Sequence, residues 1–310
     1  MGKISILGAS GFIGSHLMKS LSTETDLINA VSRSGVFPAT SVKTKHFKLS
    51  LETVETWPEE IFDVDTIYYL ISSSTPGSGQ KDLSGDIALN LQQAVKLFER
   101  IRNPHTHVIF ASSGGTVYGD EGGKPHSEQD ATDPICGYGI VKLALEKYLQ
   151  MMAREERLKY SILRLANPYG PWNIESATAD KNPFGVISVF INNLAKGKPI
   201  QLIGSQDSKR DYIYIDDLIE ALNKVRKNPL ARNQIYNIGT GLGTSLSEIV
   251  QNLQSLQKFE PTMLPARAFD VAQNVLDISK IKNELGWSPR TGLSDGISTT
   301  FKWRMSLPGG

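Results

Sequence analysis

Short apolar runs alternate with longer amphipathic segments along the first half of the chain. Strands are predicted for the apolar runs 3–8, 27–32, 65–72, 106–112 and 160–167. Helices are predicted for the segments 12–21, 85–102 and 138–156. The second of these has apolar residues at Ile87, Leu91, Val95 and Phe98, which is the spacing of one helix face. Because apolar strands alternate with helices, the pattern predicts an α/β fold whose parallel sheet is covered on both faces.

The pattern becomes irregular after Asn167. The stretch 168–185 is rich in Pro, Gly, Asn and Ser, which is typical of loops. Helices are then predicted from 186 to about 197, at 216–227, at 246–257 and near 279–285, with short strands between them. We therefore expect a doubly wound parallel sheet joined to a smaller C-terminal domain.

Composition and charge exclude several classes of function. The net charge of +1 and the scattered basic residues give no nucleic-acid footprint. The single cysteine, Cys136, allows no intrachain disulfide, and no Cys/His cluster has zinc spacing. No apolar run approaches the ~20 residues of a membrane span, and no signal-peptide pattern precedes the first strand. We therefore expect a cytoplasmic protein with neither a nucleic-acid nor a membrane partner.

Three glycines follow the first predicted strand and open the first predicted helix. Gly8, Gly11 and Gly14 allow a tight turn and a close backbone approach, and the helix N-terminus favours the pyrophosphate of a dinucleotide. Ser10, Phe12 and Ile13 lie in the same loop and are expected to contact the cofactor as well. The alternative is a glycine-rich turn that binds nothing.

Tyr138 and Lys142 are four residues apart on the third predicted helix, so they share one face. A lysine ammonium beside a phenol favours the phenolate, so we expect the pKa of Tyr138 to lie below ~10. Such a tyrosine can move a proton to or from a sugar hydroxyl while a nicotinamide takes the hydride. Taken alone, the pair also fits two surface residues. The Ser/Gly loop 110–120, which ends the preceding strand, makes the catalytic interpretation more specific.

Together these motifs resemble the extended short-chain dehydrogenase/reductases, in particular the sugar-nucleotide epimerases and dehydratases. The resemblance runs nearly end to end. It is carried by GASGFIG (8–14), DIALNLQQAV (86–95), SSGGTVYG (112–119), YGIVK (138–142), LRLANPYGP (163–171), RDYIYIDDL (210–218), NIGTG (237–241) and ISKIKNELGWSPR (278–290). It implies a Rossmann sheet that binds NAD(P) and a smaller domain that binds a nucleotide sugar. The first would take residues 1–166 and about 211–241, and the second about 167–210 and 242–310.

The resemblance also implies roles for further residues. Leu70 and Asn90 would join the cofactor site, and Tyr138 and Lys142 would contact the cofactor as well. The substrate-binding residues would be Asn167, Asn182, Phe184, Arg210, Arg267 and Asp270. Of these, Arg210 and Arg267 would hold the nucleotide phosphates, because a planar guanidinium binds phosphate oxygens in pairs. Members of the family often form homodimers through two helices per subunit, here 85–102 and 138–156.

The Ser/Gly loop departs from the family pattern. The position of the usual catalytic hydroxyl, three residues before Val117, holds Gly114. Either Ser113 or Thr116 must supply the hydroxyl, and we favour Thr116. The acid pair that dehydratases need before Val117 is also absent, since Gly115 and Thr116 stand there. Dehydration is therefore not expected, whereas epimerisation and keto reduction remain open.

The second strand departs in another way. An acidic residue that holds the NAD ribose is expected after it, but the chain reads Ser32, Arg33, Ser34. An arginine with two hydroxyls would accept the 2′-phosphate of NADP, which an acid would repel. We therefore favour NADP over NAD. Alternatively, Arg33 stacks on the adenine or faces solvent while NAD binds. Ser50 stands where the family often has an aspartate for the adenine amino group.

Three functions follow from these features. The first is C4 epimerisation of a UDP-hexose or its N-acetyl form through a 4-keto sugar. The second is an NADPH-dependent 4-ketoreductase of a nucleotide sugar, which Arg33 favours because net reduction consumes NADPH. The third is a dinucleotide sensor without catalysis, for which Gly114 is the supporting feature.

Overall fold

Seven parallel strands form the central sheet in the order β11-β6-β5-β4-β1-β2-β3. In chain order they are β1 (Lys3–Leu7), β2 (Leu27–Ser32), β3 (Thr44–Lys48), β4 (Thr66–Tyr69), β5 (His107–Ser113), β6 (Lys159–Leu165) and β11 (Gln234–Ile238). The structure is a computed structural model that describes residues 2–21, 27–39, 43–77, 81–119, 123–172, 185–264 and 273–307. The strand order reverses between β1 and β4, and ligands of such sheets bind beyond the carboxyl ends of the strands at this point.

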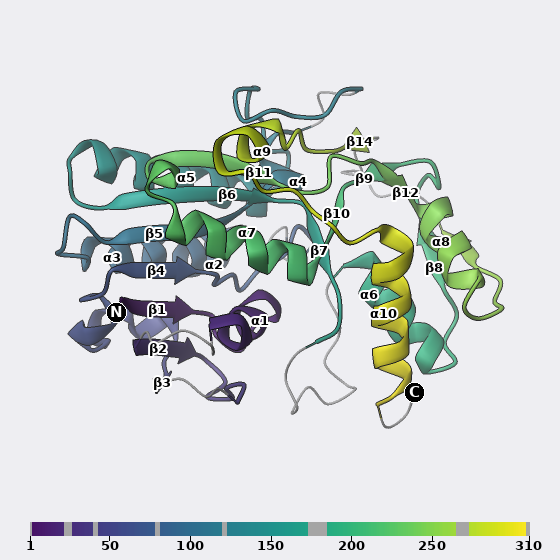
Figure 1. Cartoon of the computed structure of the whole chain (residues 1–310), viewed down its shortest axis with the longest axis horizontal. Coiled ribbons are helices and arrows are strands. Elements are labelled where there is room, and N and C mark those ends of the chain that lie inside the picture. The colour runs from purple at the N-terminus through teal and green to yellow at the C-terminus, as the bar shows by residue number, and fades with distance from the viewer. Residues whose placement is uncertain are drawn as a thin grey trace.

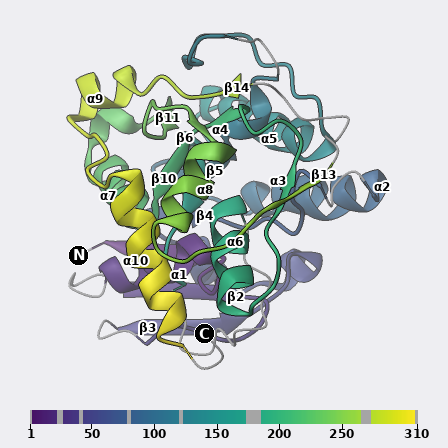
Figure 2. The ribbon, with the colours of Figure 1, turned by 90° about the vertical axis from the view of Figure 1, so that its right-hand side faces the viewer.

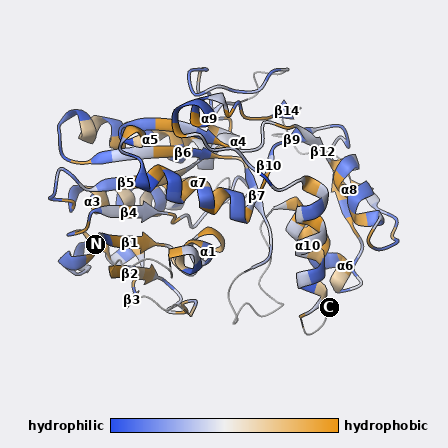
Figure 3. Cartoon of the chain, viewed as in Figure 1, coloured by the Kyte–Doolittle hydropathy of each residue, from blue (hydrophilic) through white to orange (hydrophobic). Residues whose placement is uncertain are grey.

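Helices cover both faces of this sheet, as the apolar strands predict (Figure 1). On one face, α1 (Phe12–Leu21), α7 (Ile215–Lys227) and α9 (Ser279–Leu285) enclose a core with β1 and β2. On the other face, α3 (Gln93–Glu99) and α5 (Gly137–Arg154) enclose a second core with β4 and β5. Figure 3 shows β1 and β2 in the orange of hydrophobic residues, as expected for strands buried on both sides.

A second region gathers beyond the carboxyl ends of the strands (Figure 2). Its helices are α6 (Val186–Ala195), α8 (Leu246–Gln254) and α10 (Leu293–Met305). Its short strands are β7 (Asn167–Tyr169), β8 (Gln201–Ile203), β9 (Lys209–Arg210), β10 (Tyr212–Tyr214), β12 (Thr244–Ser245), β13 (Thr262–Leu264) and β14 (Gln273–Asn274). The Arg304 side chain on α10 donates to Asn192 on α6 over 3.1 Å and ties two of these helices together. The predicted Rossmann fold with a C-terminal part is thus confirmed, while the domain boundaries stay a prediction.

Three elements differ from the sequence prediction. The helix predicted at 85–102 is divided into α2 (Leu83–Asp86), a π-helical segment η3 (Ile87–Gln92) and α3. Strand β3 was not predicted because it is a largely exposed, polar edge strand, with the sequence TKHFK. Helix α10 was not predicted because glycine and β-branched residues within LSDGISTTFKWRM are poor helix formers. Tertiary packing stabilises this helix, since Ile297 and Thr300 are fully buried.

Candidate active site

The glycine loop joins β1 to α1 at the point where the strand order reverses. Gly8 has φ +97°, and its carbonyl accepts a hydrogen bond from the amide of Gly11 over 2.9 Å. A Cβ at Gly14 would lie 2.1 Å from the Gly8 oxygen, so a side chain there has no room. The backbone therefore packs tightly at the start of α1, where the first N–H groups of a helix have no partner within the helix. This geometry fits the pyrophosphate of a dinucleotide.

Three serine hydroxyls gather beside this loop at the end of β2. The Oγ atoms of Ser10 and Ser32 are 2.5 Å apart, those of Ser32 and Ser34 3.0 Å, and those of Ser34 and Ser10 3.3 Å. Arg33, which stands between Ser32 and Ser34 in the sequence, has an exposed side chain. At Ser50, the hydroxyl donates to Glu52 over 2.8 Å. The cluster offers hydroxyls and a guanidinium where a ribose-binding acid is expected.

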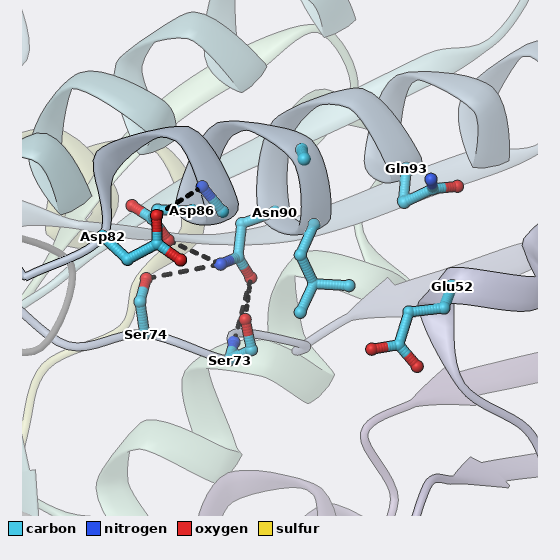
Figure 4. A pocket seen from close by; sticks show the side chains of 10 residues that line it. Glu52, Ser73, Ser74, Asp82, Asp86, Asn90 and Gln93 are labelled. Carbon is cyan, nitrogen blue, oxygen red and sulfur yellow. Dashed lines mark hydrogen bonds between the residues drawn. The ribbon is translucent and has the colours of Figure 1, made fainter.

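Asn90 is hydrogen-bonded to the loop that follows β4. Its side-chain oxygen accepts hydrogen bonds from the backbone and the hydroxyl of Ser73, both 2.9 Å, and its amide donates to Asp86 over 2.6 Å. Figure 4 shows Asn90 between Asp86 on one side and Ser73 and Ser74 on the other. These residues line a pocket of about 440 Å³ that also includes Glu52. Asn90 therefore holds one wall of the expected cofactor cleft in place.

Leu70 lies directly against the glycine loop. Its amide donates to the carbonyl of Leu7 over 3.0 Å, which extends the β1–β4 pairing by one residue. Its own carbonyl carbon would be 3.3 Å from a Cβ at Gly8. The predicted cofactor residues of β1, β2 and β4 are thus brought together at one edge of the sheet.

Asp86 was missed from the sequence. Its side chain is only 7% exposed, and its Oδ2 atom has no hydrogen-bond partner among the described residues. The i,i+4 spacing of Asp86 and Asn90 would have been the signal for their contact. Its negative charge also raises the pKa of both Tyr138 and Lys142.

Tyr138 and Lys142 lie at the start of α5, next to the carboxyl end of β5. The Lys142 ammonium is 5.7 Å from the centre of the Tyr138 ring and donates to the carbonyl of Ala111 over 2.8 Å. It also lies 4.9 Å from the centre of the Phe110 ring. The Lys142 side chain is buried. Tyr138 is partly exposed as a whole residue, but the surrounding protein desolvates its phenol. The helix spacing thus brings the pair together as predicted.

The expected lowering of the pKa of Tyr138 is wrong for this structure. Burial raises the pKa of Tyr138 to about 12, although hydrogen bonds with Ser72 and Ser113 oppose that rise. Burial also lowers the pKa of Lys142 to about 8, although the nearby carboxylates of Glu146 and Asp86 oppose that fall. Desolvation disfavours the charged form of each group, and here it outweighs their neighbours.

The Ser/Gly loop forms the turn α4 (Gly114–Val117) directly after β5. Gly114 is closely packed, because a Cβ there would lie 2.6 Å from the Leu276 side chain. Ser113 precedes the turn, and its hydroxyl lies close enough to the Tyr138 phenol to lower the pKa of that phenol. The Oγ1 atom of Thr116 is buried and has no hydrogen-bond partner in the described part of the chain. Of the two candidate hydroxyls, Ser113 is therefore the one in contact with Tyr138.

Two of the predicted substrate residues, Asn167 and Arg210, lie on strands of the second region. Asn167 donates through its backbone and its side chain to the carbonyl of Asp211, over 3.0 and 2.9 Å. Arg210 on β9 donates to the carbonyl of Lys209 over 2.9 Å. Asn182, Phe184, Arg267 and Asp270 lie outside the described residues.

Asp211 connects two of the sequence motifs in space, RDYIYIDDL (210–218) and NIGTG (237–241). Its carboxylate is buried and accepts from the backbone and hydroxyl of Thr240, over 2.8 and 2.7 Å, and from the backbone of Gly241 over 3.1 Å. It therefore ties the loop after β11 to the strand that carries Arg210. The sequence analysis missed this role, although the carboxylate directly after Arg210 was a signal for it.

Two other kinds of site find no support within the described ranges. No group of three or more His, Cys, Asp or Glu side chains there could hold a metal ion. Nor does any helix in those ranges combine the length and apolar character needed to cross a bilayer.

Known proteins resemble this chain in sequence and in fold. The model of the NAD dependent epimerase/dehydratase family matches residues 4–239. A dTDP-4-dehydro-6-deoxyglucose reductase of Escherichia coli is 33% identical over 96% of both chains. A UDP-glucose 4-epimerase of Thermotoga maritima, solved with UDP-glucose, has a TM-score of 0.86 at 28% identity and covers 97% of this chain and 98% of its own. A UDP-glucose 4-epimerase of Thermus thermophilus, solved with NAD, has a TM-score of 0.83 at 25% identity, with 98% and 99% covered. The chain therefore belongs to the NAD-dependent epimerase/dehydratase family.

Proposed function

We propose that the protein interconverts the C4 epimers of a UDP-linked hexose through a 4-keto sugar. The observation that carries this proposal is the contact of the Tyr138 phenol with Ser113 beside the buried Lys142. The loop before Val117 has no acid pair, so it lacks the groups that would remove water from the sugar. The similarity to UDP-glucose 4-epimerases supports the same reaction.

The chain's own residues would handle the proton of the C4 hydroxyl. Ser113 would hold this hydroxyl, and Tyr138 would take its proton and later return it to the keto oxygen. Because burial disfavours the phenolate, the charged Lys142 ammonium on the same helix face is needed to stabilise it. A nicotinamide cofactor, when bound, would supply the redox chemistry at C4.

We propose that the cofactor carries a 2′-phosphate. The glycine loop would hold its pyrophosphate, and Arg33 with Ser32 and Ser34 would receive the phosphate. In a fluorescence titration, NADPH should bind more tightly than NADH, and an Arg33→Ala variant should lose that preference. Equal binding of the two by the unmodified protein would instead support NAD with Arg33 facing solvent.

The nucleotide sugar is proposed to bind between the central sheet and the second region. Asn167 and Arg210 would face it from the strands that link the two. The roles of Asn182, Phe184, Arg267 and Asp270 in this site stay predictions. So do the domain boundaries and the cytoplasmic location.

We also propose a homodimer formed by the helices that carry Asn90 and Tyr138. α2 and the π-helical segment η3, which carries Asn90, both pack against α5, and all three expose apolar side chains. The exposed residues are Leu83 (55%), Ile87 (51%), Ile140 (56%), Tyr148 (39%) and Met151 (40%). A second copy of this chain would cover them, as the resemblance to dimeric family members implies.

A 4-ketoreductase is the second candidate function. Arg33 and the serine cluster favour a cofactor that is consumed, and the Escherichia coli relative is named as a reductase of a 4-keto deoxysugar. The Tyr138–Lys142 pair would serve both reactions, because reduction also needs a proton at the C4 oxygen.

One experiment separates the two candidates. The purified protein is incubated with UDP-galactose without added cofactor, and separately with a dTDP-4-keto-6-deoxyhexose and NADPH. We expect NMR to show UDP-glucose in the first reaction and no stoichiometric loss of NADPH in the second. NADPH consumption that matches product formation, together with no epimerisation, would reject the epimerase in favour of the reductase.

A further inference from the structure

Polar side chains form a row across three neighbouring strands, just before the strands end at the candidate site. Ser112 on β5, Arg164 on β6 and Asn237 on β11 are register partners, and all three are buried. Two residues earlier on the same strands, and therefore on the same face of the sheet, the register partners Phe110 and Ile162 are apolar and buried. Strands inside parallel sheets are usually apolar throughout. Three buried polar side chains side by side are therefore unusual and suggest a function.

Glu146 of α5 lies over this row and is fully buried. Its Oε1 atom accepts from the Ser112 hydroxyl over 2.5 Å. Both of its carboxylate oxygens accept from the Arg164 guanidinium, with a shortest distance of 2.8 Å. The ion pair is almost completely excluded from solvent, since the two side chains are 3% and 0% exposed. Breaking such a pair is costly, but its net contribution to stability is small, so stability alone does not account for it.

Arg164 extends the contacts to the Ser/Gly turn. Its guanidinium carbon lies 4.8 Å from the centre of the Tyr118 ring, and the Tyr118 hydroxyl donates to Asn237 over 2.6 Å. The network therefore reaches the end of the turn that begins directly after Ser113.

The network also meets the Tyr138–Lys142 pair. Tyr138, Lys142 and Glu146 follow one another at intervals of four residues on α5, so they share one face. Lys142 donates to the carbonyl of Ala111, and the next residue, Ser112, donates to Glu146. Two adjacent bonds therefore attach one face of α5 to the end of β5, next to Ser113.

We propose that Glu146 is a positioning residue for proton transfer at the candidate active site. Through its bonds to Ser112 and Arg164, Glu146 fixes the position of the catalytic face of α5 relative to the end of β5. The Tyr138 phenol is thereby kept close to Ser113. The charge of Glu146 also supports the ammonium form of Lys142, together with Asp86, which faces Lys142 from α2. The proposal rests on the proposed function, because it assigns Glu146 a part in that chemistry.

Three variants test the proposal. Ser112→Ala removes one of the two attachments and leaves both oxygens of Glu146 bonded to Arg164. Glu146→Gln removes the charge but keeps the shape. Ser161→Ala is the control, because Ser161 is also buried on an inner strand. Its hydroxyl bonds to the carbonyl of Ala231 over 2.6 Å and to the His107 ring over 2.7 Å, both away from the site.

We expect Ser112→Ala to lower kcat about tenfold or more, since small misplacements of catalytic groups are that costly. KM should change less than about twofold, because the substrate contacts remain. Ser161→Ala should leave both constants unchanged. Equal effects of Ser112→Ala and Ser161→Ala on kcat would overturn the proposal, because they would reflect only the loss of a buried hydroxyl.

A second readout does not depend on activity. The titration of Lys142 is followed by ¹³C NMR with labelled lysine, and a Lys142→Arg variant identifies its signal. In Glu146→Gln the midpoint should fall below the value of about 8 expected for the unmodified protein. An unchanged midpoint would contradict the proposed electrostatic role even if the substrate of the enzyme proved to be another sugar. A shifted midpoint without epimerase activity would reject the substrate assignment alone.

Discussion

At the scale of single residues, burial acts against charge on both members of the Tyr138–Lys142 pair. It raises the pKa of Tyr138 to about 12 and lowers the pKa of Lys142 to about 8. At neutral pH the phenol is therefore protonated and most of Lys142 is charged. The charge on Lys142 is lost only slightly above neutral pH, whereas an exposed lysine keeps it to ~10.

This shift predicts an alkaline limit to activity. If the charged ammonium stabilises the phenolate, kcat should fall as the pH rises through about 8, where Lys142 loses its proton. A pH profile of kcat between about 6 and 10 measures this. In a Lys142→Arg variant with residual activity, the limit should disappear, because arginine keeps its charge. A rate that stays constant up to pH 10 in the unmodified protein would contradict the role of the ammonium.

Replacing the tyrosine tests whether Tyr138 is the catalytic acid–base group. Tyr138→Phe should lower kcat by about 10²- to 10⁴-fold, the usual contribution of a general acid–base group. Its cofactor affinity should change little, because the proton transfer and not the binding is lost. Tyr160→Phe, on β6, is the control and should behave as the unmodified protein. Full activity of Tyr138→Phe would contradict the catalytic role assigned to Tyr138.

Residue spacing in the sequence identified the pair but not its environment. The i,i+4 spacing of Tyr138 and Lys142 places them on one face in any helix. How deeply that face is buried depends on β5 and α2, which are distant in sequence, so the direction of the pKa shift of Tyr138 could not be predicted. For the same reason, the choice between Ser113 and Thr116 needed the three-dimensional packing of the turn.

At the scale of elements, some predicted bounds agree with the structure, whereas the strongly periodic segment 85–102 is divided. The bounds of α1, β2 and α9 agree with the prediction to the residue. The π-helical segment Ile87–Gln92 keeps the apolar spacing of a helix, so the sequence pattern could not reveal it. It widens the helix at Asn90, which bonds the loop after β4, and wide turns of this kind are frequent at functional sites.

The close packing of the glycine loop against the start of α1 predicts how a substitution there affects cofactor binding. Gly14→Ala would bring a Cβ within 2.1 Å of the Gly8 oxygen, so the start of α1 must move. Such overpacking costs about 1–3 kcal/mol, and the dissociation constant of the cofactor should rise by about tenfold or more. Cofactor titration and thermal unfolding measure the two effects.

Gly77→Ala is the control for this variant, because no atom lies within 4 Å of the added carbon. It should leave cofactor binding unchanged. Tight cofactor binding by Gly14→Ala would show that the dinucleotide does not depend on this close packing.

At the scale of the whole molecule, the apolar surface on α2 and α5 predicts the oligomeric state. Ile140→Glu places a charge where the second copy would pack, so the dimer should dissociate to the 34.1 kDa monomer. Light scattering after size exclusion measures the mass. Leu230→Glu, at a site that is 69% exposed outside these helices, should leave the dimer intact. A monomeric unmodified protein at micromolar concentration would reject the dimer.

The architecture as a whole was predictable because it repeats one unit. Alternating β and α segments restrict the connections to a few topologies, and the first glycine loop places the cofactor at the point where the strand order reverses. The second region was less predictable, because strands of two or three residues have too little periodicity to be recognised in the sequence. The contacts of Asp211 with Thr240 and Gly241, together with the pairing of β12 with β9, hold the loop after β11 beside Arg210.

The central claim is that the sugar is oxidised and then reduced again at C4 by the same bound cofactor. The most direct test uses UDP-glucose that carries deuterium at C4 and follows the formation of UDP-galactose by NMR and mass spectrometry. We predict that the product retains the deuterium at C4, with no label in the solvent or in free cofactor. Loss of the label from C4 during epimerisation, or its transfer to added cofactor without epimerisation, would contradict the account.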